Sequence, residues 1–182
     1  MNFIETEVPG VWIIEPKVWG DHRGYFIETF KKELFEKNIG KAEFIQDNES
    51  YSSFGVLRGL HYQIGEYSQA KLVRVLHGKV LDVAVDVRKS SPNFGKSVAV
   101  ELSADNKRQL FVPRGFAHGF LVMSEFALFS YKVDNVYAPQ HERSIVYNDV
   151  DLAIDWQIEL KDLKLSDKDL HAPAFKNAEV FI

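Results

Sequence analysis

The sequence predicts an all-β fold of the jelly-roll kind, with a few short helices beside the strands. Aromatic residues are abundant, with 14 phenylalanines and 7 tyrosines among 182 residues, and such side chains suit half-buried pleated surfaces. Short apolar runs recur at regular spacing between turn-like segments such as 91–95 and 104–106. Because many short strands and few helices pack as facing sheets or a closed barrel, a sandwich or barrel is expected.

The composition is that of one domain, which we expect to span residues 1–182. Apolar residues make up 46% of the chain and the formal net charge is -4, which allows a hydrophobic core and leaves no basic footprint for nucleic acid. Cysteine is absent, which excludes disulfides, thiolate metal sites and cysteine nucleophiles. The acidic N-terminus lacks a secretory pattern and no segment reaches membrane-spanning length, so a cytoplasmic protein without a membrane partner is expected.

The first element predicted along the chain is a helix over residues 28–39. Phe30, Leu34 and Phe35 recur at helical spacing, charged residues fill the opposite face, and Gly40 marks the end of the pattern.

Strands are predicted where apolar and polar side chains alternate. In one such segment Leu81, Val83 and Val85 share a face opposite Asp82 and Asp86. The predicted strands are 55–63, 71–75, 79–87, 98–102, 109–112, 119–123 and 127–133.

A short helix is predicted near the C-terminus. Ser166 is a suitable N-cap, Asp167 and Asp169 are acidic residues of the first turn, and Pro173 stops the helix. An acidic residue in the first turn stabilises the helix start, which is a sufficient reason for Asp169 at this position. The alternative is that its carboxylate orients an imidazole and supports the charged form of that imidazole.

The segment 55–63 carries the most informative polar side chains. Arg58 and His61 fall close together along one extended segment, while His61 and Gln63, two residues apart, share a face of any strand. An isolated strand histidine is usually structural. With Arg58, Gln63 and then Lys71 as neighbours, His61 is interpreted as a base within a face that binds an anionic ligand.

A metal site is not expected. The segment 113–120 is a tight turn leading into a strand with His118 near its start, a pattern shared with the second motif of cupin barrels. In metal-binding cupins the first motif supplies two histidines and a glutamate, where this chain has His61, Gln63 and then Lys71. An ammonium group repels a divalent ion, and two histidines are too few for a closed site.

Lys71 and Tyr131 each have two interpretations. Lys71 is either a solvated strand lysine or an inward ammonium that stabilises a developing negative oxygen. Tyr131 is either an aromatic packed in the sheet or a phenol that donates a proton.

Two arginines in glycine-containing motifs, Arg23 and Arg58, suit bidentate binding of phosphate oxygens, and surface ion pairs are the alternative. Further candidate contacts to such a ligand are the rings of Phe26 and Tyr137 and the amides of Gln46 and Asn48. The alternative for either ring is that it packs in the hydrophobic core.

Five motifs, taken together, are highly specific. They are Asp21-x-Arg23-Gly-x-Phe26-x-Glu28, Gln46-Asp-Asn48-x-Ser50, Gly55-Val-Leu-Arg58-Gly-Leu-His61-Tyr-Gln63, Pro113-x-Gly115-x-x-His118-Gly-Phe120 and Tyr137-x-Pro139-x-x-Glu142. With these motifs in this order, the chain resembles the dTDP-4-dehydrorhamnose 3,5-epimerase family. The resemblance implies a cupin-type jelly roll, no metal or organic cofactor, and a homodimer that exchanges N-terminal strands.

The same resemblance implies a reaction of dTDP-rhamnose biosynthesis. The substrate would be dTDP-4-dehydro-6-deoxyglucose, whose C4 ketone acidifies the protons on C3 and C5, and the product dTDP-4-dehydro-L-rhamnose. By analogy, His61 removes these protons and Asp169 completes a dyad with it. Lys71 would hold the enolate oxygen with His118 nearby, while Tyr131 would return the proton from the opposite face. His61 must then share one cavity with Lys71 and Tyr131.

The substrate-binding residues follow by the same analogy. Arg23 and Arg58 map to the diphosphate, and some contacts would come from the partner subunit. The residues mapped to the nucleotide and sugar pocket are Phe26, Glu28, Gln46, Asn48, Tyr137 and Glu142.

Other functions stay open on the sequence. They are an epimerase of C3 or C5 alone, a 3,4-ketoisomerase, and a non-catalytic cupin that binds a sugar nucleotide. Two departures from the family pattern bear on the choice of substrate: Glu49 stands where histidine is common, and 146–150 replaces a stretch of tryptophan, two acids and proline.

Overall fold

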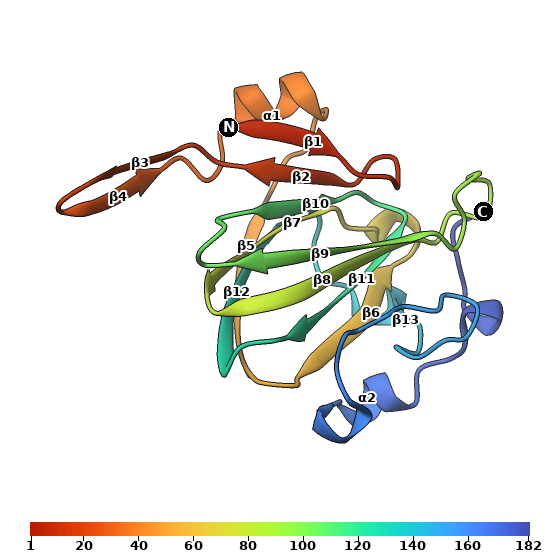
Figure 1. The fold of residues 1–182 in the computed structure, drawn as a ribbon. Helices are drawn as coiled ribbons and strands as arrows, with labels where there is room; N and C mark the ends of the chain where they lie inside the picture. The colour runs from red at the N-terminus through yellow and green to blue at the C-terminus, as the bar shows by residue number, and fades with distance from the viewer.

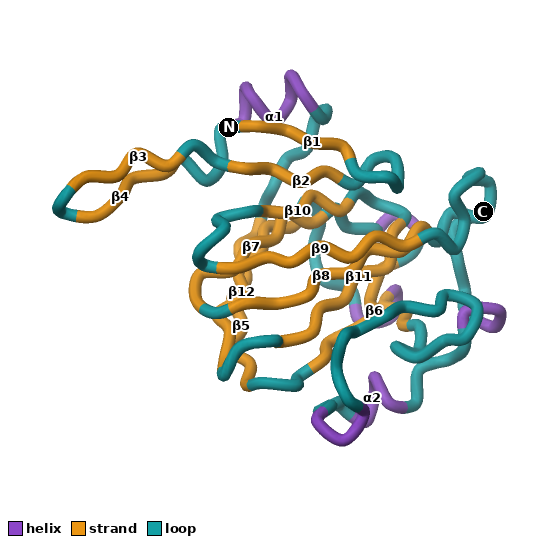
Figure 2. Tube along the Cα trace, in the orientation of Figure 1, coloured by secondary structure: helices purple, strands orange, loops and turns teal.

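Two antiparallel sheets pack face to face, which confirms the predicted jelly roll (Figure 1). The computed structural model describes residues 1–182 apart from the side chain of Leu160. Figure 2 shows that strands dominate the body of the molecule, with loops concentrated around its C-terminal part.

The larger sheet has six strands in the spatial order β1-β2-β10-β7-β12-β5. Their bounds are Asn2–Glu5 (β1), Trp12–Glu15 (β2), Gln109–Val112 (β10), Lys71–His77 (β7), Phe126–Val133 (β12) and Gln46–Ser53 (β5).

The smaller sheet has five strands in the order β13-β6-β11-β8-β9. Their bounds are Glu142–Ser144 (β13), Leu57–Gln63 (β6), Phe116–Val122 (β11), Lys79–Asp86 (β8) and Ser97–Ser103 (β9).

The remaining elements are a hairpin, two α-helices and four 3-10 turns among the described residues. They are β3 (Val18–Asp21), β4 (Gly24–Ile27), α1 (Lys32–Asn38), α2 (Asp167–Leu170), η1 (Gly65–Tyr67), η2 (Pro139–His141), η3 (Leu160–Asp162) and η4 (Phe175–Asn177). The longer α-helix, α1, has 7 residues, and none of the described helices could span a membrane.

The main core lies between the two sheets. Phe120 of the smaller sheet stacks on Phe129 of the larger sheet, with ring centroids 4.1 Å apart. Valines such as Val73 and Val80 surround this pair and are fully buried. Burial of so much apolar surface is the main force that holds the sheets together.

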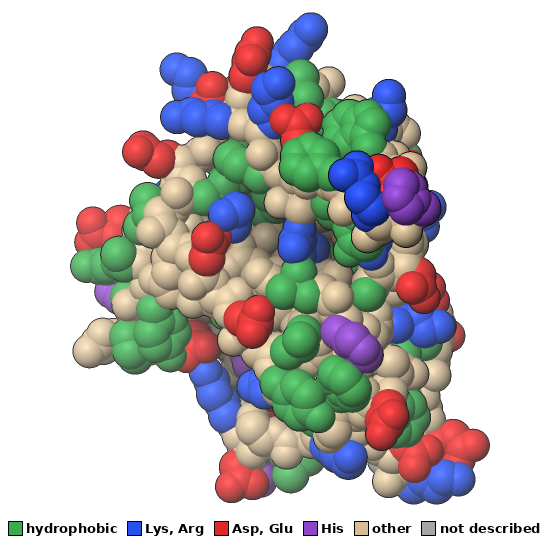
Figure 3. Space-filling view, turned by 90° about the vertical axis from the view of Figure 1, so that its left-hand side faces the viewer, with side chains coloured by type: hydrophobic (Ala, Val, Ile, Leu, Met, Phe, Trp, Pro, Cys, Tyr) green, Lys and Arg blue, Asp and Glu red, His purple; other side chains and the backbone are tan. Residues whose placement is uncertain are grey.

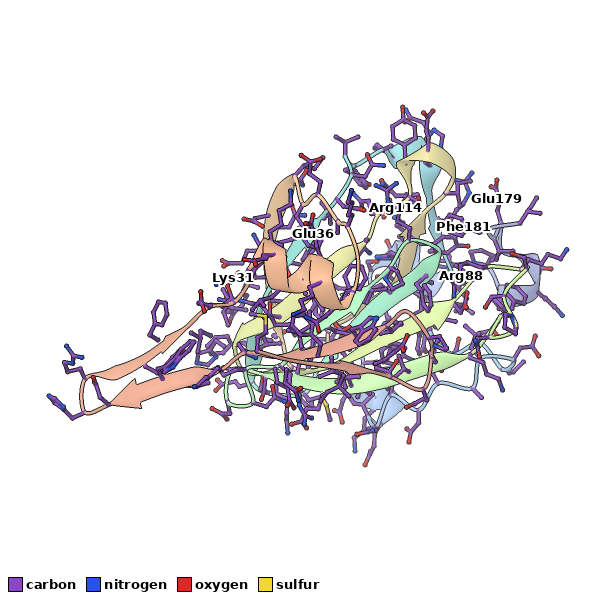
Figure 4. The ribbon with its side chains drawn as sticks, turned by 90° about the horizontal axis from the view of Figure 1, so that it is seen from above. Lys31, Glu36, Arg88, Arg114, Glu179 and Phe181 are labelled. Carbon is purple, nitrogen blue, oxygen red and sulfur yellow. The ribbon has the colours of Figure 1, made fainter. Side chains whose placement is uncertain are left out.

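Each sheet is also covered on part of its outer face. Helix α1 lays Phe35 on Phe111 of the larger sheet, with ring centroids 5.0 Å apart. The C-terminal segment covers the smaller sheet with the buried side chains of Ile145 and Trp156. Near the end of the chain Phe181 forms a bridge with Arg88, and Figure 4 shows these two residues on the same side of the molecule.

The predicted strands from 71 to 133 are confirmed with shifts of a few residues at their ends. The predicted helix 28–39 is wrong at its start, because α1 begins only at Lys32. The carbonyl of Thr29 instead accepts a hydrogen bond from Gln109 of β10 at 2.6 Å. This contact to the sheet keeps the start of the segment out of the helix. The short helix capped by Ser166 is confirmed as α2.

The β3–β4 hairpin projects away from the body (Figure 1). Arg23 lies in the turn of this hairpin, where the Asp21 carboxylate accepts from its backbone N–H at 2.8 Å. Tyr25 and Phe26 are 60% and 64% exposed. Seen from the hairpin side, hydrophobic side chains form exposed patches between charged ones (Figure 3).

Candidate active site

A cavity of about 470 Å³ opens between the two sheets, and a second lobe of about 360 Å³ adjoins it. His61, Lys71 and Tyr131 line both lobes. His61 belongs to the smaller sheet, whereas Lys71 and Tyr131 belong to the larger sheet. The three side chains therefore share one cavity, as the family analogy requires.

An irregularity in β6 places Arg58 and His61 on the same cavity. Residues three apart in a regular strand point to opposite faces, but the pairing of β6 with β11 shifts register between His118 and Phe120. Gly59 has φ +128°, and a Cβ there would meet the Cα of Gly119 at 2.5 Å. Glycine is therefore required where the two strands approach most closely.

His61 and Asp169 form a hydrogen-bonded pair. The distance from Nε2 of His61 to Oδ1 of Asp169 is 2.5 Å. The His61 side chain is 27% exposed and that of Asp169 only 3%, so the carboxylate lies behind the ring. With Nε2–H donated to Asp169, the lone pair of a neutral His61 is on Nδ1, where it can act as a base.

Asp169 is held as a carboxylate by its surroundings. Burial raises its pKa, but hydrogen bonds from His61 and Ser166 and the charges of His61 and Lys168 outweigh burial, so the pKa lies below its ordinary value. The Ser166 hydroxyl donates to Oδ2 of Asp169 at 2.9 Å and also caps α2 by accepting from the Asp169 N–H at 3.1 Å. The Ser166 hydroxyl therefore both caps α2 and orients the Asp169 carboxylate.

Lys71 points inward from β7. Its ammonium is 3.5 Å from the carbonyl oxygen of His61, to which it donates. Burial lowers its pKa to about 8, while the charges of Asp82 and Glu142 oppose that shift. Lys71 is partly buried and lines both lobes of the cavity, which favours the inward interpretation over a solvated strand lysine.

Tyr131 lies on β12 with its ring packed against Phe129, at a centroid distance of 6.0 Å. Burial raises the pKa of its phenol, Glu142 raises it further, and the nearby Arg58 lowers it. A phenol with a raised pKa stays protonated near neutral pH and can serve as a proton donor. Tyr131 is thus a packed aromatic that also lines the cavity, and its role as a proton donor stays a prediction.

His118 lines the main lobe next to His61, its direct partner across β6 and β11. Its Nε2 donates to both carboxylate oxygens of Asp82, at 2.8 and 3.0 Å. Each histidine of the cavity is thus held by a buried carboxylate, His61 by Asp169 and His118 by Asp82.

Arg58 lines the main lobe and donates from Nε to the hydroxyl of Ser52 at 3.1 Å. Among the described side chains it forms no ion pair, which leaves the guanidinium available to an anion.

The second lobe gathers predicted nucleotide and sugar contacts. Gln46, Asn48, Tyr137 and Glu142 line it. The Tyr137 hydroxyl donates to Glu142 at 2.8 Å, and the Lys168 ammonium lies 2.5 Å from the same carboxylate oxygen. Burial raises the pKa of Glu142, but these two contacts and nearby positive charge outweigh it, so the pKa lies below its ordinary value.

Arg23, Phe26 and Glu28 are not brought to the cavity within this chain. Arg23 lies at the hairpin turn, with 78% of its side chain exposed, and pairs with Asp21 at 2.6 Å. Phe26 contacts Trp19 across the hairpin, with ring centroids 5.8 Å apart. None of the three lines either lobe.

Gln63 lines the second lobe, and its amide is held by backbone groups. Its amide nitrogen donates to the carbonyls of Tyr67 and Val136, and its oxygen accepts from the N–H of Ala138. Within the described part of the chain, no three His, Cys, Asp or Glu side chains gather in a way that could hold a metal ion.

Sequence reasoning missed several residues in or behind the cavity wall. Asp82 is fully buried, although the alternation of side chains in β8 predicts that it lies on the polar face of the strand. Ser50 lies in the cavity wall, with a buried hydroxyl that has no partner among the described residues. Lys164 reaches the cavity from the C-terminal segment. That segment has no strand periodicity from which its position could be predicted. Glu49 and the segment 146–150 line neither lobe.

Comparisons with known proteins agree on one family. The model of the family described as dTDP-4-dehydrorhamnose 3,5-epimerase matches residues 5–177. A protein of that name from Shigella flexneri is 55% identical over 183 residues, covering 100% of both chains.

Solved structures show the same fold. A Legionella pneumophila epimerase in complex with dTDP-4-keto-L-rhamnose is 50% identical, with a TM-score of 0.93 over 97% of this chain and 93% of the other. A 3'-monoepimerase from Streptomyces bikiniensis in complex with dTDP-quinovose is 34% identical, with a TM-score of 0.88 over 94% of this chain and 87% of the other.

Proposed function

This chain belongs to the dTDP-4-dehydrorhamnose 3,5-epimerase family, and we propose that it inverts C3 and C5 of dTDP-4-dehydro-6-deoxyglucose to give dTDP-4-dehydro-L-rhamnose. One observation carries this proposal. A base backed by a carboxylate and a protonated phenol come from opposite sheets, and a lysine beside them lines the same cavity. A base, an oxyanion partner and an acid on the far side are what inversion next to a ketone requires.

The first step is the removal of a ring proton by His61. Nδ1 takes the proton from the carbon next to the C4 ketone, and the electron pair of the C–H bond moves into the ring to give an enolate. The Lys71 ammonium stabilises the enolate oxygen, and Asp169 stabilises the imidazolium that forms.

Tyr131 completes the inversion. Its phenol donates a proton to the same carbon from the opposite side of the ring, and the enolate returns to the ketone. Because Tyr131 and His61 stand on opposite sheets, removal and return take place on opposite faces. Proton exchange with solvent then restores both side chains. The same pair acts on C3 and on C5, and no step uses a metal or an organic cofactor.

The rest of the substrate is bound through its diphosphate and nucleoside. Arg58 is the diphosphate ligand within the chain, and the second lobe holds the neighbouring contacts through Gln46, Asn48, Tyr137 and Glu142. A related structure contains dTDP-4-keto-L-rhamnose, which supports a dTDP-sugar as the ligand.

The projecting hairpin supports a homodimer with exchanged arms. Arg23 and Phe26 are exposed on β3–β4, away from the cavity of their own chain. We therefore assign Arg23, Phe26 and Glu28 to the cavity of a second copy, where arginine reaches the diphosphate and the aromatic ring a flat base. In this proposal residues 1–182 act as one epimerase domain in each subunit of a cytoplasmic dimer.

The test is solvent deuterium incorporation into dTDP-4-dehydro-6-deoxyglucose, followed by NMR at each carbon. The wild-type enzyme is expected to label C3 and C5, and the His61→Ala variant is expected to label neither, because general-base catalysis contributes on the order of a hundredfold or more. Exchange at both carbons in His61→Ala would refute the assigned base.

A matched control is His77→Ala, which removes a histidine that stacks on Phe126 at 4.3 Å. This histidine lines neither lobe of the cavity. Labelling at both carbons is expected to persist in the control.

A single-centre epimerase is the second candidate, since a 3'-monoepimerase shares the fold at 34% identity. The same NMR experiment separates the two. Inversion at one carbon alone would replace the proposed reaction with this one, and a 3,4-ketoisomerase would instead move the carbonyl. Binding of dTDP without any exchange would indicate a non-catalytic protein.

A further inference from the structure

Asp82 is a fully buried carboxylate that the proposed reaction steps do not use. It lies in the middle of β8, on the inner face of the smaller sheet, beside the core residues Val80 and Ala84. Its side chain is 0% exposed. A buried charge is costly unless it is paired, so apolar packing alone does not account for an aspartate at this position.

Asp82 holds His118 from behind. His118 Nε2 lies 2.8 and 3.0 Å from the two oxygens of Asp82, and an ionised carboxylate at this place accepts from the Nε2–H. Because Nε2 is occupied, the Nδ1 side of the His118 ring is the one left for the cavity that the residue lines.

Lys71 comes from the other sheet, since β7 and β8 lie in different layers (Figure 1), and it lines the same lobe as His118, the hydrogen-bond partner of Asp82. Burial lowers the pKa of Lys71, and Asp82 is the foremost charge opposing that shift. Burial likewise holds the pKa of Asp82 above its ordinary value, while the charge and hydrogen bond of His118 and the charge of Lys71 oppose that rise. Each of the two buried charges therefore favours the ionised form of the other.

We infer that Asp82 is a positioning residue of the epimerisation: it is the counter-charge that keeps Lys71 protonated and turns His118 toward the enolate oxygen. This inference rests on the proposed function, because it assigns Asp82 a part in stabilising the enolate. The charged or titratable groups that line the two lobes with Lys71 are Arg58, His61, Tyr62, His118, Tyr131, Tyr137, Glu142, Lys164 and Asp169.

The test is the pH profile of kcat in the Asp82→Asn variant. Asparagine keeps the shape and one acceptor oxygen but removes the charge, so Lys71 should lose its proton at lower pH. Opposite charges typically shift a pKa by about one to three units. We expect the alkaline limb of kcat to move down by about one unit relative to the wild type, with KM changed less than about threefold. An alkaline limb that stays in place overturns the inference.

Asp86→Asn is a matched control on the same strand. Asp86 is also fully buried, but its carboxylate binds Arg88 and Ser91 away from the cavity. We expect this control to lower stability and leave the alkaline limb unchanged. Asp82→Glu keeps the charge and is expected to restore the wild-type limb; a limb shifted as far as in Asp82→Asn would contradict the role of charge.

A direct titration of Lys71 by NMR, with lysine labelled at Cε and without substrate, separates this inference from the proposed function. A lower pKa of Lys71 in Asp82→Asn than in the wild type is expected, and equal values overturn the inference. A lower lysine pKa with an unshifted kcat profile also overturns it, since Asp82 would not then act on the reaction through Lys71.

The wild-type measurement suffices if Asp82→Asn does not fold. Lys71 must be protonated at pH 7, and a neutral Lys71 at that pH overturns the inference. Absence of turnover in the wild type would count against the proposed function alone, because the titration needs no reaction.

Discussion

Tyr131 is the residue whose replacement should separate the two halves of the reaction. The Tyr131→Phe variant keeps the ring that packs on Phe129 but removes the proton donor. We expect deuterium exchange to persist within about tenfold of the wild type, while formation of the inverted product falls on the order of a hundredfold.

The measurement is NMR of label and product from the same reaction, with Tyr51→Phe as control. Tyr51 stacks on Phe126 and lines neither lobe, so its variant should behave as the wild type. Equal losses of exchange and inversion in Tyr131→Phe would count against the assigned acid.

Asp169 links the catalytic pair to stability. Its folded pKa is lowered, so its stabilising contribution is fully present above the unfolded value of about 3.9 and is lost as pH falls through the folded pKa. Asp169→Asn should lower the free energy of unfolding at pH 7 by about 1–3 kcal/mol, with a difference from wild type that shrinks below pH 4.

Urea unfolding between pH 3 and 7 checks this expectation. Asp167→Asn is the control, because Asp167 lies in the same helix but is exposed. A difference between wild type and Asp169→Asn that does not vary with pH would mean that the charge of Asp169 does not stabilise the fold.

At the scale of elements, the contact of β6 with β11 is the one that sets the geometry of the cavity. A Cβ at Gly59 would lie 2.5 Å from the Cα of Gly119 and 2.8 Å from the carbonyl oxygen of His118. Gly59→Ala should therefore destabilise the protein by on the order of 3 kcal/mol, from backbone strain and overpacking together, and lower kcat by displacing His61.

Thermal unfolding of Gly59→Ala and Gly40→Ala separates the two causes. Gly40 has a similar φ of +134° but open space around its Cβ position, so only strain of about 1 kcal/mol is expected there. Equal losses of stability would show that the approach of β6 to β11 is not the limiting feature.

At the scale of the whole molecule, exchanged arms predict complementation between two inactive variants. One carries Arg23→Ala with Phe26→Ala, and the other carries His61→Ala. A mixed dimer holds one site with an intact base and an intact partner arm. Random exchange of subunits should restore roughly a quarter of wild-type activity, since half of the dimers are mixed and each has one working site.

The measurement is activity after the two variants are unfolded together and refolded, with each variant refolded alone as control. No gain on mixing, while size-exclusion chromatography shows dimers, would mean that each arm does not serve the other subunit.

Local patterns in the amino-acid sequence are enough to predict the jelly roll, most strands of the two sheets and the helix capped by Ser166. They also point to the family, which the comparisons confirm. These features are local. Alternation of side chains and short motifs are set by residues close together in the chain, and hydrophobic patterning carries that information without reference to distant contacts. The residue roles remain predictions until the variants are measured.

The construction of the cavity depends on contacts between residues far apart in the chain. His61 meets Asp169 across 108 positions of sequence, and Asp82, on the polar face of an alternating strand, turns into the core and binds His118. The hairpin carries Arg23 away from the cavity of its own chain. Contacts of this kind depend on strand register and on how two sheets face each other, which no local pattern specifies.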